Sequence, residues 1–256
     1  MTFTYQGILT WLSQLIWPLL RISGLFISMP LISSAVVPNR VRVIFAFALS
    51  FLILPMVPER LSFLNFNGTF VVHIFNELML GIMMGFILQL VFQIFVMGGQ
   101  IISLQAGLGF AIMVDPDSHA SVPLLSQFYQ LMTALTFLAL DGHLAVLDAL
   151  MVSFREMPVG SLDTDLSGIS SILAFSSLIF KESVLVSLPA ILALLIVNLS
   201  FGIMTRMAPQ LNIFSLGFPI SLLMGVIIVK ISLPGVSAQI ADSLEQGMQL
   251  IKGLLH

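Results

Sequence analysis

The chain has 256 residues, of which 58% are hydrophobic and only 8% are charged, and its mean hydropathy is +1.10. Soluble domains carry about 25% charged residues, so the composition indicates an integral membrane protein or the apolar centre of a membrane complex. The net charge of −3 gives no indication of nucleic-acid binding. The absence of cysteine excludes disulfides, thiolate metal sites and cysteine nucleophiles.

About six apolar runs predict membrane helices, because a spanning helix needs about 20 mostly apolar residues. In chain order they are 8–29, 41–57, a run from 77 to beyond 96, 124–140, 184–204 and 213–229. The first run lacks a preceding basic region and contains Arg21, so we expect a retained first membrane helix and not a cleaved signal peptide. Pro189 and Pro219 lie inside the last two runs, where proline should kink or split a helix.

Two segments differ from these runs. Residues 153–171 contain charged residues and turn formers, and they predict the one long soluble loop. In residues 236–255 apolar residues recur every three to four positions and polar residues lie between them, which predicts an amphipathic helix. We expect this helix to pack on a partner; the less favoured alternative is that it lies on a membrane surface. Lysine and arginine are too few and too evenly spread among the loops to fix the orientation in a membrane.

Small and polar residues open the third run. Gly81 and Gly85 are four residues apart, a spacing that lets two helices approach closely, and we interpret them as packing residues. Glu77 precedes them and has two interpretations. It could line a polar path, but a carboxylate near a helix N-terminus is the favoured one.

A glycine-rich stretch, "GGQIISLQAGLGF" from residue 98 to 110, ends the third run. It is not a dinucleotide fingerprint, because no strand precedes it and its spacing is wrong. In lipid, the backbone groups that such a break frees must be satisfied by protein or by a water-filled cavity. The residues alone leave a loop beside a pore and an ordinary connecting loop equally open.

The acidic stretch that follows contains Asp115, Asp117 and His119. Oxygen and nitrogen ligands at alternate positions could hold a metal, but Asp-Pro starts turns commonly and a solvated turn is favoured. Ser118 and His119 do not make a hydrolase, because a triad needs a third group and an oxyanion hole.

Three further residues have competing interpretations. Asp141 and Asp148 could serve an intramembrane protease, but "DGH" at 141–143 is better interpreted as a helix stop and turn. Arg206 lies between two long apolar runs, where an arginine must be paired, interfacial or in a polar cavity. One interpretation is that Arg206 holds helices or subunits together. The other is that its side chain extends to place the charge at the membrane–water interface, and neither role is preferred.

Four segments carry a family resemblance. They are "WPLLRISGLFISMPLISSAVVPNRVR", "GGQIISLQAGLGFAIMVDPDSHASVP", "LDGH" and "RMAPQLNIFSLGFPISLLMG". Together they resemble the FliR/SpaR/YscT family of type III secretion export-gate subunits over nearly the whole chain, and the block 206–225 is the most specific. The flagellar branch is favoured. Asp141 departs from some members, which carry asparagine, so no role is assigned to it.

The resemblance implies an all-α membrane-associated fold of bent helical hairpins in a helical multi-subunit pore. Residues 1–174 would be a FliP-like part with a plug loop, and residues 175–256 a FliQ-like hairpin ending in the amphipathic helix. The expected partners are FliP, FliQ, FlhB, FlhA, exported flagellar proteins and membrane lipid. The expected place is the flagellar basal body in the bacterial inner membrane. No enzymatic activity, cofactor, metal or nucleic-acid partner is implied.

The resemblance also assigns two groups of residues. The pore-sealing plug would comprise Gly107, Gly109, Phe110, Ile112, Met113, Val114, Asp115 and Pro116. Apolar groups at a constriction can block ions by dewetting, and the two glycines would let the loop move aside. Assembly would depend on Arg206, Pro209, Gln210, Asn212, Phe214, Gly217 and Pro219. The rival function is a small secondary transporter with broken helices at a midplane site, which Pro189 and Pro219 favour slightly.

Overall fold

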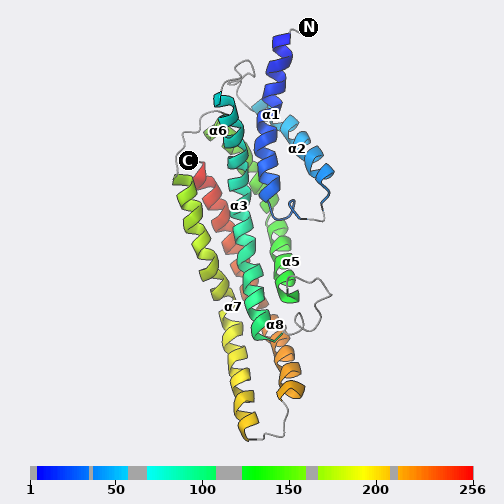
Figure 1. The fold of residues 1–256 in the computed structure, drawn as a ribbon, viewed down its shortest axis with the longest axis vertical. Helices are drawn as coiled ribbons and strands as arrows, with labels where there is room; N and C mark the ends of the chain where they lie inside the picture. Colours follow the sequence, from blue (N-terminus) through cyan, green and yellow to red (C-terminus); the bar gives the residue numbers. More distant parts are fainter. Residues whose placement is uncertain are drawn as a thin grey trace. The chain divides into compact units, whose positions relative to one another are not determined.

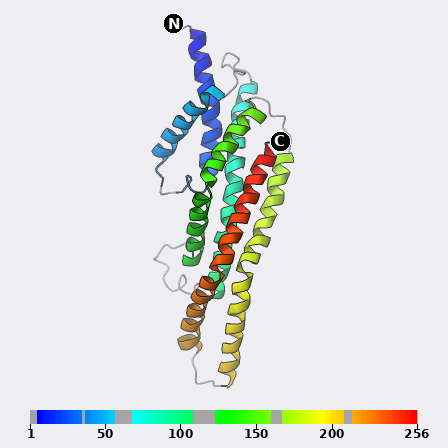
Figure 2. The same ribbon diagram turned by 180° about the vertical axis from the view of Figure 1, so that it is seen from behind.

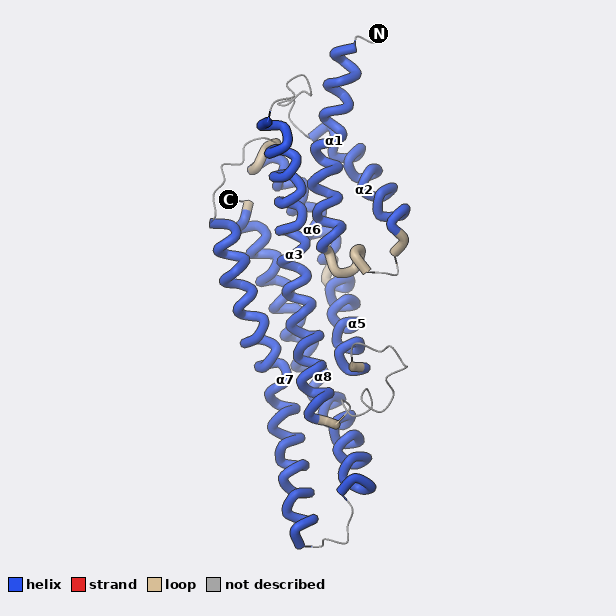
Figure 3. The backbone as a smooth tube through the Cα atoms, viewed as in Figure 1, coloured by secondary structure: helices blue, strands red, loops and turns tan. Residues whose placement is uncertain are grey.

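The computed structural model describes residues 5–34, 37–56, 68–107, 123–159, 167–207 and 213–255. These residues form seven α-helices and one short 3-10 helix, with no strand among them (Figure 3). The all-α prediction is therefore confirmed. The elements are α1 (Tyr5–Ser28), α2 (Asn39–Ile53), η1 (Leu54–Met56), α3 (Gly68–Gln105), α5 (Leu124–Ala139), α6 (Gly142–Glu156), α7 (Ser167–Met207) and α8 (Ile213–Leu254).

The chain divides into two compact units, each built from separate stretches of sequence. Unit 1 comprises residues 1–90, 141–175 and 244–256, and unit 2 comprises residues 91–140 and 176–243. Helices α3, α7 and α8 contribute to both units. The predicted boundary between residues 174 and 175 falls inside α7, and the FliP-like and FliQ-like division stays a prediction.

In unit 1, α1 packs on both α2 and the first half of α3 (Figure 1). Phe26 of α1 stacks on Phe45 of α2 with ring centroids 5.3 Å apart. On the α3 side, Trp17 and Phe70 meet edge to face with ring centroids 5.5 Å apart. These contacts bury an apolar stripe of α1, which includes Ile22 and other residues with little or no exposed surface.

In unit 2, α7 and α8 run antiparallel beside one another, as both views show (Figures 1 and 2). Helix α5 packs on the second half of α3, where Phe92 and Phe137 meet edge to face with ring centroids 6.0 Å apart. On another face of α3, Gly98 lies against α7: a Cβ atom added there would be 3.4 Å from both Ser183 O and Val186 Cγ1. The two helices are therefore in ordinary van der Waals contact at this glycine.

Three helices are long and apolar enough to cross a membrane: the described parts Phe70–Gln105, Ser170–Met207 and Pro219–Leu254. Helices α5 and α6 add a fourth if they count as one broken span. In the α3 segment, 61% of the most apolar window is buried within the protein, compared with 22% in each of the other two. The faces of α7 and α8 that the chain leaves uncovered are thus strongly apolar, which fits contact with lipid or with other helices.

Several predicted elements differ from the observed ones. Residues 153–156 belong to α6 and not to a loop, and α7 begins at Ser167, well before the predicted 184. Pro189 and Pro219 do not split their helices, which are continuous through them. This continuity removes the broken helices that favoured the transporter interpretation.

The prediction that the C-terminal amphipathic helix packs on a partner is also wrong. Helix α8 continues without a break into the predicted amphipathic segment, and Pro234 also lies inside it. The apolar face of that segment packs within the chain itself, since Ile240 and Ile251 have no exposed surface. Asp242, Glu245 and Lys252 are exposed on the other face. The periodicity correctly predicted a helix with one buried face, but it could not identify what buries that face.

Candidate functional site

A buried charge cluster lies at the centre of unit 1. Arg21 of α1 donates to both carboxylate oxygens of Glu77 on α3, from Nε to Oε2 at 2.8 Å and from Nη2 to Oε1 at 3.0 Å. The Arg21 side chain has no exposed surface and that of Glu77 only 2%. This two-point geometry matches the planar guanidinium to the planar carboxylate, the strongest arrangement such a pair can adopt.

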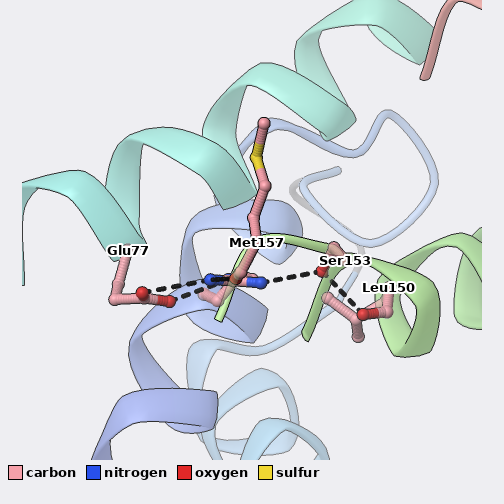
Figure 4. Close-up of polar contacts among 5 residues, drawn as sticks. Glu77, Leu150, Ser153 and Met157 are labelled. Carbon is pink, nitrogen blue, oxygen red and sulfur yellow. Dashed lines mark hydrogen bonds and ion pairs between the residues drawn. The ribbon is translucent and has the colours of Figure 1, made fainter. Parts of the chain in front are cut away.

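Helix α6 completes the cluster from a third side. Arg21 Nη1 donates to Ser153 Oγ at 3.0 Å, and Nη2 donates to the carbonyl of Met157 at 3.0 Å (Figure 4). Ser153 in turn donates to the carbonyl of Leu150 at 2.6 Å. The Phe154 ring lies 4.2 Å from the guanidinium carbon, where its negative face attracts the cation. One arginine thus connects α1, α3 and α6.

The pattern of residues predicted neither the pair nor its location. Glu77 was expected at a helix N-terminus, but α3 begins at Gly68, so Glu77 lies in the third turn and is buried. The favoured interpretation is therefore wrong. A signal did exist: Arg21 and Glu77 are single opposite charges in two apolar runs, and ionisable residues in such runs usually pair.

Glycines bring α1 and α3 together beside this cluster. A Cβ atom at Gly81 would overlap the carbonyl oxygen of Arg21, and one at Gly85 would overlap the Ser28 hydroxyl and lie 2.7 Å from the carbonyl oxygen of Leu25. The Ser28 hydroxyl also lies 3.0 Å from the carbonyl of Ile82 across the interface, in position to donate to it. The prediction that Gly81 and Gly85 are packing residues is confirmed. The close approach allows the guanidinium of α1 to reach a carboxylate on α3.

The predicted plug begins where α3 ends. Gly107 has a left-handed φ of 83°, and its amide donates to the carbonyl of Leu104 at 3.1 Å. A glycine in this conformation is common at the C-terminal end of a helix, because it carries no Cβ that would clash. The remaining plug residues, 109–116, lie outside the described residues, as do Asp117 and His119. Their role stays a prediction.

In unit 2 a small polar bridge meets the end of α3. Ser221 of α8 donates to Asn198 Oδ1 of α7 at 3.1 Å, and Asn198 Nδ2 lies 3.5 Å from the carbonyl of Gln105. Gly225 of α8 packs on Ala106, whose Cβ would lie 2.8 Å from a Cβ at that glycine. The residues just before Gly107 therefore contact both α7 and α8.

The predicted assembly residues are spread along two helices. Arg206 lies exposed in the last turn of α7, Pro219 is exposed within α8, and Gly217 is buried within α8. Phe214 belongs to α8, and Pro209, Gln210 and Asn212 lie outside the described residues. An assembly role for these residues stays a prediction.

Asp141 and Asp148 do not lie on facing helices, as a two-aspartate protease would need. Asp141 precedes α6 with a left-handed φ of 54°, and Asp148 is exposed within α6. The helix stop predicted at "DGH" is confirmed, because α5 ends at Ala139 and α6 begins at Gly142. The described residues thus define an all-helical membrane protein whose centre in unit 1 is a structural ion pair.

The family follows from comparison with known proteins. Residues 12–247 match the family described as "Bacterial export proteins, family 1", and the chain belongs to this family. The flagellar biosynthetic protein FliR of Escherichia coli (strain K12) is 35% identical over 90% of this chain and 88% of its own length. FliR of Aquifex aeolicus (strain VF5) is 35% identical over 84% and 83%. The resemblance to the FliR family is therefore confirmed.

A relative with a different name is also similar to the chain. The surface presentation of antigens protein SpaR of Shigella flexneri is 26% identical over 82% of this chain and 81% of its own length. Membership of an export family agrees with the long apolar helices, which fit a protein embedded in a membrane.

Proposed function

We propose that the chain is a core subunit of the flagellar type III protein export gate and helps form the pore through which unfolded flagellar proteins leave the cytoplasm. The observation that carries the proposal is the family match over residues 12–247, together with similarity to FliR proteins over about 90% of the chain. The gate would lie in the bacterial inner membrane, within the flagellar basal body. Its partners would be FliP, FliQ, FlhB and FlhA, and its substrates the exported flagellar proteins.

The uncovered helix faces are consistent with a subunit that packs among other helices. Along α7 and α8 the exposed side chains include large apolar residues on many successive turns. Among them are Leu188, Leu192, Leu195, Ile196, Leu199, Ile203, Ile220, Leu223, Val226, Ile227 and Ile231. An apolar surface of this extent needs lipid or a partner to cover it.

Within the gate, we propose that residues 107–116 seal the resting pore. Gly107 ends α3 with a left-handed turn, which would redirect the chain away from the helix axis. The apolar side chains that follow in the sequence, Phe110 to Val114, would exclude water and so block ions. We further propose that Arg206 and the residues up to Pro219 hold neighbouring subunits.

Affinity purification tests the proposed function. A tagged copy extracted from membranes in mild detergent should carry FliP- and FliQ-like chains with it, and it should restore swimming to a strain that lacks its own FliR. Recovery as a free monomer, without these chains and without restored motility, would contradict the proposal.

A matched pair of variants tests the assembly residues. Arg206→Ala should reduce the recovered partners, whereas Lys181→Ala, another exposed cation on the same helix, should not. Equal recovery from both variants would remove Arg206 from the proposal.

Because the chain contains no cysteine, a single cysteine introduced at Met113 can test by crosslinking whether the plug faces the pore. Its failure to crosslink with any partner subunit would argue against a pore-facing position.

A further inference from the structure

Two serines in unit 2 have buried hydroxyl groups that make no hydrogen bond within the described part of the chain. They are Ser103 in the last turn of α3 and Ser126 in the first turn of α5, and neither residue has any exposed surface. A buried hydroxyl without a partner is unfavourable, so native proteins nearly always supply one. Hydroxyls that face no protein partner in a protein interior are usually bonded to ordered water.

These serines differ from the other buried hydroxyl residues of the bundle. At several other buried positions the hydroxyl donates to a carbonyl one turn earlier in its own helix, as in Thr133 to Tyr129 at 2.8 Å and Ser187 to Ser183 at 2.8 Å. This local bond is the ordinary way to satisfy a serine or threonine in a membrane helix. Ser103 and Ser126 do not use it, so their hydroxyl groups are directed elsewhere.

The two serines lie at one helix crossing. A Cβ atom at Gly99 of α3 would lie 2.8 Å from Ser126 Cα, and Ser103 is one turn after Gly99 on the same face of α3. Side chains four residues apart are about 6 Å apart, so Ser103 and Ser126 lie within about 9 Å of each other. One or two water molecules can bridge such a separation.

Tyr129 adds a buried aromatic ring to the crossing. It lies one turn after Ser126, is fully buried, and its ring would be 3.0 Å from a Cβ at Gly99. Its hydroxyl approaches Ser232 of α8. Among the described residues, Ser103 and Ser126 are thus the two unpartnered serine hydroxyls at this crossing.

We propose that Ser103 and Ser126 line a shared hydration site in unit 2, where ordered water bonds both hydroxyl groups and Tyr129 closes one side. The ligand is water or a neutral hydroxylic molecule of that size, since no charged side chain is among the three. The crossing of α3 and α5 would then be held partly through water and not only by dry apolar packing. This inference does not depend on the export function.

Thermal unfolding of the full chain, measured in the complex with which it purifies, tests the site. The sign of the change in Tm caused by each serine substitution distinguishes a hydrated site from a dry one. With water present, Ser103→Ala and Ser126→Ala should each lower the Tm by roughly 2–4 °C, because the water loses a partner. Without water, each variant removes an unsatisfied polar group and should raise the Tm. A rise, or no change, would overturn the proposal.

Two further measurements make the test specific. If the site is shared, the double variant should lower the Tm no more than the stronger single variant, whereas additive losses would exclude a common site. Ser200→Ala is the matched control, because its exposed hydroxyl already donates to Ile196 and the change should leave the Tm nearly constant. If a variant fails to assemble, a high-resolution electron microscopy map decides: density between the two hydroxyls supports the site, and direct side-chain packing there overturns it.

Discussion

Arg21 and Glu77 form a two-point ion pair with almost no exposed surface, although 56 residues separate them in the chain. We expect Arg21→Ala and Glu77→Gln each to destabilise the protein by about 3–5 kcal/mol, because each leaves a buried polar or charged group without its partner. Reduced abundance in membranes and a lower Tm of the purified complex would report this. Arg155→Ala, on the exposed surface of α6, should change neither quantity.

The double variant Arg21→Met with Glu77→Leu sharpens this test. Because apolar residues of similar volume often replace a buried ion pair without loss, we expect it to be more stable than either single variant. A double variant as unstable as the sum of Arg21→Met and Glu77→Leu, each made singly, would show that the charges act independently. The proposed coupling would then be wrong.

Gly81→Ala should separate α1 from α3. The added methyl group would overlap the backbone carbonyl of Arg21, which cannot move away as a flexible side chain could. We expect a loss of about 3 kcal/mol or more, at the upper end of overpacking effects, measured as a shift in the unfolding midpoint. Gly202→Ala is the control, since a Cβ there meets nothing within 4 Å and should be neutral or slightly stabilising. Similar effects of the two substitutions would refute the close crossing.

Asp141 should be a site where glycine is better than the native residue. Its φ of 54° is unfavourable for a residue with a Cβ, and its side chain makes no capping hydrogen bond. Asp141→Gly should therefore raise the stability by about 1 kcal/mol, and Asp141→Val should lower it. Differential scanning calorimetry on the purified complex measures both. A clear loss of stability in Asp141→Gly would reveal a contact of the carboxylate that its exposure does not suggest.

Deletion of residues 110–115 should make the assembled gate permeable at rest. If these residues supply the apolar seal, their removal should let small ions pass, which slows growth and lowers the membrane potential reported by a voltage-sensitive dye. A deletion of equal length at 160–165, in a polar segment, should leave the membrane ion-tight. An ion-tight and fully motile 110–115 deletion strain would remove the plug assignment.

Local sequence patterns predicted the apolar helices well, because a membrane helix must satisfy its backbone internally and therefore needs a long apolar run. The same reasoning missed α6, because its last residues, Arg155 and Glu156, resembled the start of a loop. It also shortened α7, because Lys181 and Glu182 seemed to mark the start of the run although both lie well within the helix. Charged residues are compatible with a helix wherever their side chains reach solvent, and burial cannot be known from local sequence.

The buried site was less predictable than the helices. Pairing Arg21 with Glu77 requires knowing that α1 crosses α3 at Gly81, and this is a tertiary contact between distant segments. The glycine spacing correctly indicated a close crossing, but not which helix approaches. The plug and assembly residues came from family resemblance, and local physics alone left the plug segment between two interpretations.

The ion pair also has a consequence for the order in which unit 1 can pack during synthesis. Helix α1 is translated before α3, and burying the Arg21 charge without a partner would be strongly unfavourable. The carboxylate that neutralises Arg21 is translated 56 residues later, and the Ser153 hydroxyl 132 residues later. Stable packing of α1 is therefore coupled to the synthesis of α3, so Arg21 should stay solvated until its carboxylate partner has been made.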